Sequence, residues 1–188
     1  MASTTDIKKG VCMKYNNDIF SIVDFQHVKP GKGGAFVRAK MKSLTNGKVI
    51  ENTWNSGAAI DLVRVERRKF QYLYKDDTGF NFMDQNTFEQ ITLQDTMIEN
   101  GDLYKEGQEV EIIFDAENER PLSCELPLSI NLRITESEQG VKGNTANNPM
   151  KNAKLETGAS ILIPMFVNEG DLVRINTEER AYVERVKE

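Results

Sequence analysis

The sequence is poor in the residues from which most catalytic and metal sites are built. Its 188 residues include one histidine, His27, and two cysteines, Cys12 and Cys124, which lie far apart without a Cys-x-x-Cys spacing. A histidine cluster is therefore excluded, and neither a zinc site nor a disulfide framework is indicated. We expect no metal and no cofactor, and we expect both cysteines to pack as small apolar strand residues in a reducing compartment.

Sequence motifs of nucleotide-dependent enzymes are missing as well. The Gly-x-Gly at 31–33 precedes a strand-like segment rather than a helix, which excludes a dinucleotide or Walker-type loop. The acidic pairs Asp76-Asp77 and Glu178-Glu179 fall at predicted turns, where solvation is expected. Lys32 could act as a nucleophile only inside a desolvating pocket, and a loop tip offers none. These features predict a protein that is not an enzyme.

Long apolar runs are also missing. No segment approaches the roughly 20 apolar residues that a membrane-spanning helix needs. The N-terminus shows no basic-then-apolar signal pattern. With 28% charged and 39% hydrophobic residues, the composition is typical of a soluble globular protein. We expect a cytoplasmic monomer without a membrane partner.

Helical periodicity is equally scarce, whereas short strand patterns separated by turn residues run through the whole chain. About 60 residues of such a pattern suffice for a small barrel. We therefore predict an all-β fold of three small β-barrel domains in series, with boundaries at 1–64, 65–127 and 128–188. Within it, Asn46-Gly47 predicts a tight hairpin turn, and the polar segment 140–154 predicts a loop.

The central third is rich in aromatic residues, and two interpretations of them remain open. The residues are Phe70, Tyr72, Tyr74, Phe80 and Phe82. They could stack on bases across the face of an OB fold. They could instead be cross-strand pairs in a core. We favour the core, because the chain turns acidic from residue 76 onward.

Charge is strongly segregated along the sequence. Residues 1–75 contain 14 Lys+Arg and 6 Asp+Glu, whereas the remaining residues contain 10 and 23. The formal net charge of −5 hides this asymmetry. A requirement for solubility would explain the size of the net charge but not its segregation. The basic end is therefore expected to meet a polyanion, most plausibly nucleic acid.

The most distinctive segment is Lys29-Pro30-Gly31-Lys32-Gly33-Gly34, which we call the finger. Proline fixes its own φ and glycine adds no bulk, so a stiff, narrow loop carries one amine at its tip. After the finger, Val37, Ala39 and Met41 alternate with Arg38, Lys40 and Lys42. This period of two predicts a strand with one apolar and one basic face. The alternative is an ordinary hairpin tip with a solvated lysine.

With these features assembled, the chain resembles bacterial elongation factor P over essentially its full length. The resemblance rests on an ordered set of segments: Lys29 to Arg38, Tyr72-Leu73-Tyr74, Asn86 to Gln90, Gly140-Val141-Lys142-Gly143, and Lys151 to Gly170. Two positions depart from the family pattern. Asn144 stands where the family often has aspartate, and Ile163 stands where valine is usual.

The resemblance implies an L-shaped tRNA mimic, with a KOW/SH3-like barrel followed by two OB-like barrels. It implies a factor that binds the 70S ribosome beside the peptidyl-tRNA in the P site and relieves stalling at consecutive prolines. Pro30, Gly31, Lys32 and Gly33 would then meet the tRNA acceptor end. Lys32 would be the target of a lysine-modifying enzyme.

Further contacts follow from the same resemblance. Contacts to the phosphates of tRNA or ribosomal RNA are expected for Lys29, Arg38, Lys40 and Lys42. Contacts to the small subunit or tRNA are expected for Gly143, Asn144, Thr145, Tyr182 and Arg185. Strand packing is the alternative for Tyr182. The competing functions are an OB-type single-stranded nucleic-acid-binding protein and an enzyme that uses Lys32.

Overall fold

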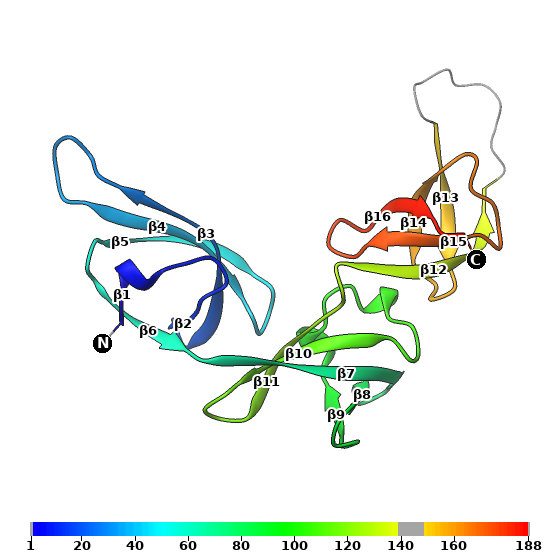
Figure 1. The fold of residues 1–188 in the computed structure, drawn as a ribbon, viewed down its shortest axis with the longest axis horizontal. Coiled ribbons are helices and arrows are strands. Elements are labelled where there is room, and N and C mark those ends of the chain that lie inside the picture. Colours follow the sequence, from blue (N-terminus) through cyan, green and yellow to red (C-terminus); the bar gives the residue numbers. More distant parts are fainter. Residues whose placement is uncertain (1, 139–148, 188) are drawn as a thin grey trace.

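The computed structural model describes residues 2–138 and 149–187. In these residues the chain is almost entirely β-strand, in three antiparallel sheets that follow one another along the sequence (Figure 1). Three short 3-10 helices interrupt the strands: η1 (Thr4–Asp6), η2 (Asp95–Met97) and η3 (Gly101–Leu103). The second sheet lies between the first and the third, and the molecule is bent at its middle. The predicted all-β fold of three domains is confirmed. The exact boundaries remain a prediction.

The first sheet has the strand order β1-β6-β2-β3-β4-β5. Its strands are β1 (Ala2–Ser3), β2 (Cys12–Tyr15), β3 (Asp18–Val28), β4 (Phe36–Ser43), β5 (Val49–Asn55) and β6 (Ala59–Val63). The alternation predicted after the finger is confirmed: Val37, Ala39 and Met41 are fully buried, whereas Arg38 and Lys40 face solvent. This alternation gives β4 one face for the core and one for a partner.

The second sheet has the strand order β11-β10-β7-β8-β9. Its strands are β7 (Val65–Asp76), β8 (Gly79–Asp84), β9 (Gln90–Leu93), β10 (Glu109–Asp115) and β11 (Arg120–Glu125). The core interpretation of the aromatic residues is confirmed for Phe70, Tyr72, Phe80 and Phe82, which are buried. The rings of Tyr72 and Phe82 lie 5.6 Å apart. Tyr74 differs, because its side chain is exposed. Buried rings cannot serve as a platform for stacking bases.

The third sheet has the strand order β14-β13-β12-β15-β16. Its strands are β12 (Ser129–Ser137), β13 (Met150–Leu155), β14 (Ser160–Pro164), β15 (Leu172–Asn176) and β16 (Ala181–Arg185). The prediction of a loop over 140–154 was wrong for residues 150–154, which belong to β13, and its part over 140–148 falls outside the described residues. Ala153 and Leu155 supply the buried face of that strand. A face carried by one alanine and one leucine gives too weak an apolar signal to be recognised among polar neighbours.

The tight turn predicted at Asn46-Gly47 is also wider than expected. β4 ends at Ser43 and β5 begins at Val49, so five residues form the loop. Leu44 leaves the strand to enter an apolar cluster, and Asp18 accepts hydrogen bonds from the hydroxyls of Ser43 and Thr45 at 2.6 and 2.7 Å. These contacts outweigh the local preference of Asn-Gly for a two-residue turn.

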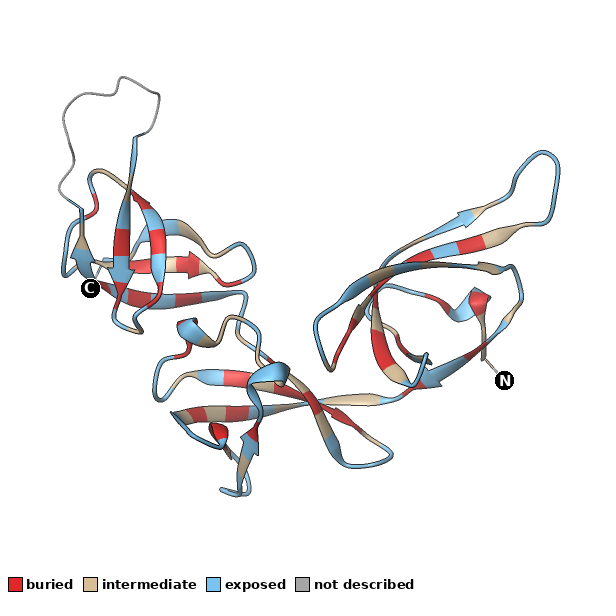
Figure 2. Cartoon of the chain, turned by 180° about the vertical axis from the view of Figure 1, so that it is seen from behind, coloured by how far each residue is buried: buried red, intermediate tan, exposed pale blue. Residues whose placement is uncertain are grey.

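The first two domains share a small core of their own. It consists of Cys12, Ile19, Leu44, Val63, Ile113 and Leu122. Five of these six residues belong to strands β2, β3, β6, β10 and β11, and Figure 2 shows buried segments where the first and second domains meet. Only Arg64 separates β6 from β7. A continuous chain and an apolar seam together hold the first domain to the second.

In the described part of the chain, none of the helices is long and apolar enough to span a membrane.

Candidate RNA-binding finger

The finger is carried by the two strands that pair next to it. β3 and β4 pair from Phe20 opposite Ser43 to Val28 opposite Phe36. The finger leaves the end of this ladder and projects beyond the rest of the first domain (Figure 1). Near its base, the rings of Phe25 and His27 meet edge to face at 5.5 Å. This ring pair packs two neighbouring positions of β3 together at the base of the finger.

The glycines of the finger are not required by the packing of the protein itself. A methyl group added at Gly31 or Gly34 would meet no atom within 4 Å, and one at Gly33 would meet only Pro30 Cγ at 3.8 Å. Gly33 has a φ of +111°, which side chains rarely adopt. The absence of side chains therefore leaves space around Lys32 that a partner can occupy.

Lys32 itself is solvent-exposed, as are Lys29 and Pro30. Within residues 2–138 and 149–187, its ammonium group makes no hydrogen bond and no ion pair. Nothing in the described chain neutralises the charge or restricts the side chain. The tip therefore presents a free cation at the end of a thin loop.

The basic face of β4 is partly paired with acids. Arg38 lies 3.6 Å from Glu51 on β5, and Lys42 donates to Glu99 of the second domain at 2.6 Å. Lys40 is exposed and has no ion pair within the described residues. Among the three, Lys40 can therefore meet a phosphate without giving up an internal contact, whereas Lys42 would have to exchange one.

The other predicted contact residues lie in the third domain. Tyr182 is half-buried against the core of that domain, which agrees with the strand-packing alternative. Arg185 lies 3.6 Å from Asp171. Both belong to β16, which lies on the limb of the molecule away from the finger (Figure 1). The prediction for Gly143, Asn144 and Thr145 falls outside the described residues.

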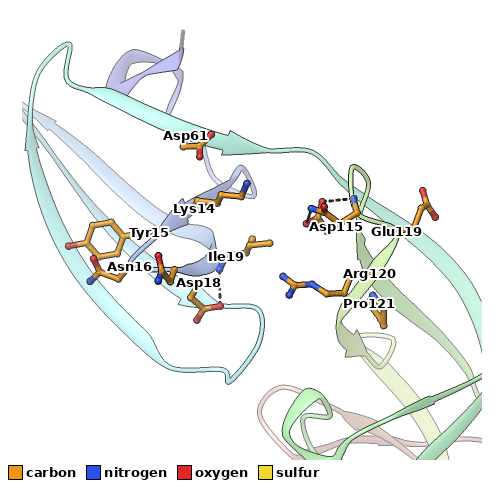
Figure 3. A pocket seen from close by; sticks show the side chains of 12 residues that line it. Lys14, Tyr15, Asn16, Asp18, Ile19, Asp61, Asp115, Glu119, Arg120 and Pro121 are labelled. Carbon is orange, nitrogen blue, oxygen red and sulfur yellow. Dashed lines mark hydrogen bonds between the residues drawn. The ribbon is translucent and has the colours of Figure 1, made fainter.

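An open groove lies between the first and second domains (Figure 3). Lys14 and Asp61 line one wall, and Asp115 and Arg120 line the other. Asp115 accepts a 2.7 Å hydrogen bond from Asn118 Nδ2, and this bond holds the pKa of that carboxyl below its usual range. Four carboxylate side chains and two cationic ones line the groove, so it offers no positive field for an anion.

Two further residues were missed in the sequence and emerge only in the structure. Arg180 and Asn100 both have a φ of +52° and meet across the boundary between the second and third domains. Neither position carries a glycine, so no sequence signal marks the two turns as unusual. In the described chain, no group of three or more His, Cys, Asp or Glu residues is arranged to hold a metal ion.

Three β-sheet domains in series, with a basic first domain that carries an exposed lysine on a thin projecting loop, fit a protein that binds a polyanion. Three family models match the chain in order: the Elongation factor P (EF-P) KOW-like domain at 3–60, the Elongation factor P (EF-P) OB domain at 65–124, and Elongation factor P, C-terminal, at 130–185. The chain belongs to the elongation factor P family. It is a translation elongation factor.

Individual relatives match the chain from end to end. Elongation factor P of Amoebophilus asiaticus is 52% identical, with 100% of this chain and 98% of the relative aligned. Elongation factor P of Flavobacterium johnsoniae is also 52% identical, with both chains fully covered. Among solved structures, translation initiation factor 5A from Methanococcus jannaschii aligns with 65% of this chain and 94% of its own, at 24% identity and a TM-score of 0.48.

Proposed function

We propose that the protein binds the ribosome beside the peptidyl-tRNA in the P site and promotes peptide-bond formation at consecutive prolines. The observation that carries this proposal is the unpaired Lys32 on its thin loop. A confined RNA site such as the peptidyl-transferase centre admits a glycine-flanked loop more readily than a loop with bulky side chains. Membership of the elongation factor P family supports the same assignment.

The mechanism requires no chemistry from the protein. The proline ring restricts the geometry of the growing chain and of its own amine, so consecutive prolines align poorly for reaction. The ribosome remains the catalyst. A factor that holds the acceptor end of the tRNA in a productive position recovers part of the barrier, up to roughly 7–11 kcal/mol in well-oriented reactions. In this account Pro30, Gly31, Lys32 and Gly33 contact the acceptor end.

Electrostatic contacts set the register of the finger on RNA. Lys29 and Lys40 are exposed, and we propose that both bind phosphates of tRNA or ribosomal RNA, together with Arg38 and Lys42. Tyr182 and Arg185, with Gly143, Asn144 and Thr145, are proposed to face the small subunit and the tRNA. The acidic remainder of the chain disfavours nonspecific wrapping along RNA, which argues against the OB-type single-strand binder.

We further propose that Lys32 is extended by a lysine-modifying enzyme. The side chain is exposed and lies beside glycines, so the active site of a modifying enzyme can enclose it. A longer side chain that remains cationic would reach further into an RNA site without a change in the fold. We also propose that the protein acts as a monomer.

The test is peptide-bond formation through three consecutive prolines in a reconstituted translation system. Protein purified from its native cells should accelerate the proline steps selectively, and Lys32→Ala prepared in the same way should lose most of that effect. Lys48→Ala serves as the matched control, because Lys48 is exposed in the same domain but lies in the other hairpin loop. Equal rates with and without the native protein would refute the proposal.

A further inference from the structure

The boundary between the second and third domains is held by side chains from two tight turns. Arg180, in the turn between β15 and β16, donates to both carboxylate oxygens of Asp102 at 2.7 and 2.5 Å and to Asn100 Oδ1 at 3.1 Å. Asn100 Nδ2 in turn donates to the carbonyl of Thr177 at 2.9 Å. We call these four residues the Arg180 clamp. Every hydrogen bond in it joins the η3 region of the second domain to the third domain.

The clamp also fixes the linker between the two domains. Thr177 is buried, and its hydroxyl donates to the Pro127 carbonyl at 2.7 Å. Its amide donates to the Leu128 carbonyl at 3.0 Å. Beside the clamp, Leu103 of η3 is fully buried within the core of the third domain. One turn of the third domain therefore binds the linker and the second domain at the same time.

The geometry of the clamp is specific to the guanidinium group of Arg180. A bidentate arginine–carboxylate pair fixes direction as well as distance, and a lysine cannot reproduce it. Arg180 and Asn100 both hold a left-handed backbone conformation, which asparagine tolerates but which is unfavourable for arginine. Such strain at Arg180 persists only where surrounding contacts determine the conformation, and here its own side chain supplies those contacts.

We propose that Arg180 is a positioning residue, which sets the angle between the second and third domains and so holds β16 at a fixed distance from Lys32. The functional part of this proposal rests on the ribosomal role proposed above. A factor that contacts one tRNA at two distant points needs both points in register. A loosened joint lowers the fraction of molecules that are ready to bind, and the apparent dissociation constant rises in inverse proportion.

The rigidity of this angle is tested on the free protein through the distance between two spin labels. The labels are attached at Asp77→Cys in the second domain and Ser160→Cys in the third. Both positions are exposed, whereas Cys12 and Cys124 are buried and burial raises the pKa of both thiols, so the introduced cysteines are labelled selectively. Pulsed dipolar spectroscopy should give one narrow distance distribution for the parent. Arg180→Ala should broaden it, and Arg180→Lys should broaden it less.

The matched control is Arg174→Ala. Arg174 forms a comparable ion pair with Glu184 at 2.5 Å, but both residues belong to the third sheet. Removing it should leave the distance distribution unchanged. Exchange of the charges in the double variant Arg180→Asp, Asp102→Arg should narrow the distribution again relative to Arg180→Asp alone.

The same variants are then tested in the triproline assay. If the competent fraction falls to roughly a third, Arg180→Ala should raise the concentration for half-maximal stimulation about threefold, while the maximal rate stays near that of the parent. An unchanged distance distribution in Arg180→Ala would overturn the proposal whatever the ribosome assay shows. A broadened distribution with an unchanged half-maximal concentration would overturn its functional part. Inactivity of the parent would instead refute the ribosomal role and leave the joint to be judged on the distances alone.

Discussion

At the scale of the residue, the basic side chains of the first domain differ in whether they already form an ion pair within the protein. Lys40 faces solvent without an internal ion pair, whereas Lys42 is bound to Glu99. Sequence alternation predicted that both would lie on one face of the strand, and it could not predict this difference. Glu99 lies 57 positions away and reaches Lys42 only because the two domains pack together. The local pattern therefore fixes the direction of a side chain but not its partner.

This difference predicts a difference in salt dependence. Each phosphate contact contributes about 0.7–0.9 to the slope of log affinity against log salt concentration. Lys40→Ala should therefore reduce the slope for ribosome binding by nearly one. Lys48→Ala should leave the slope unchanged. Filter binding or sedimentation at several salt concentrations measures it, and an unaltered slope for Lys40→Ala would remove Lys40 from the interface.

At the scale of the element, residues that alternate with a clear apolar and polar contrast were predictable, and residues that depend on distant partners were not. The alternation of apolar and basic residues from Val37 to Lys42 predicts β4 directly. β13 was missed, because Ala153 contributes little apolar signal to the face that it buries. The turn between β4 and β5 was predicted too short, because Leu44 packs against the second domain. In the second failure, a contact far away in the sequence overrides the local preference.

The aromatic pairs of the second sheet give a direct test of the core assignment. Phe82 is fully buried in contact with Tyr72, whereas Tyr74 is exposed. Phe82→Ala should lower the free energy of unfolding by about 3–5 kcal/mol. Tyr74→Ala should change it by less than about 0.5 kcal/mol. Denaturant titrations followed by circular dichroism compare the two, and equal effects would contradict the assignment.

Carboxylates in the turns predict how stability depends on pH. Hydrogen bonds, chiefly from Thr78, Asn86 and Asn118 respectively, lower the pKa of Asp76, Asp84 and Asp115 below the ordinary aspartate value of 3.8. The folded chain therefore binds fewer protons than the unfolded chain near that pH. The stabilisation is present above pH 3.8 and is lost as the pH falls through the lower folded values. The urea midpoint should accordingly fall as the pH is lowered from about 4 to about 2, and a constant midpoint over that range would contradict the assignment.

At the scale of the whole molecule, two different joints connect the three domains. An apolar cluster holds the first domain to the second, whereas contacts between the second and third include the Arg180 clamp, the Lys105–Glu156 ion pair and the buried Leu103. The sequence predicted three domains in series but carried no signal for either joint, since both are built from residues distant along the chain. In the proposed function, the finger works at one end of this bent molecule while the other end secures the tRNA and the small subunit.

The central claim is that Lys32 reaches the acceptor end of the P-site tRNA, and the most direct test is a photo-crosslink. A photoreactive amino acid replaces Lys32, and the protein is bound to ribosomes stalled on consecutive prolines. We predict crosslinks to the terminal nucleotides of the P-site tRNA and to ribosomal RNA beside them. The same photoreactive group at position 48 should give none there. Crosslinks from position 32 that fall only on sites far from the acceptor end would contradict the account.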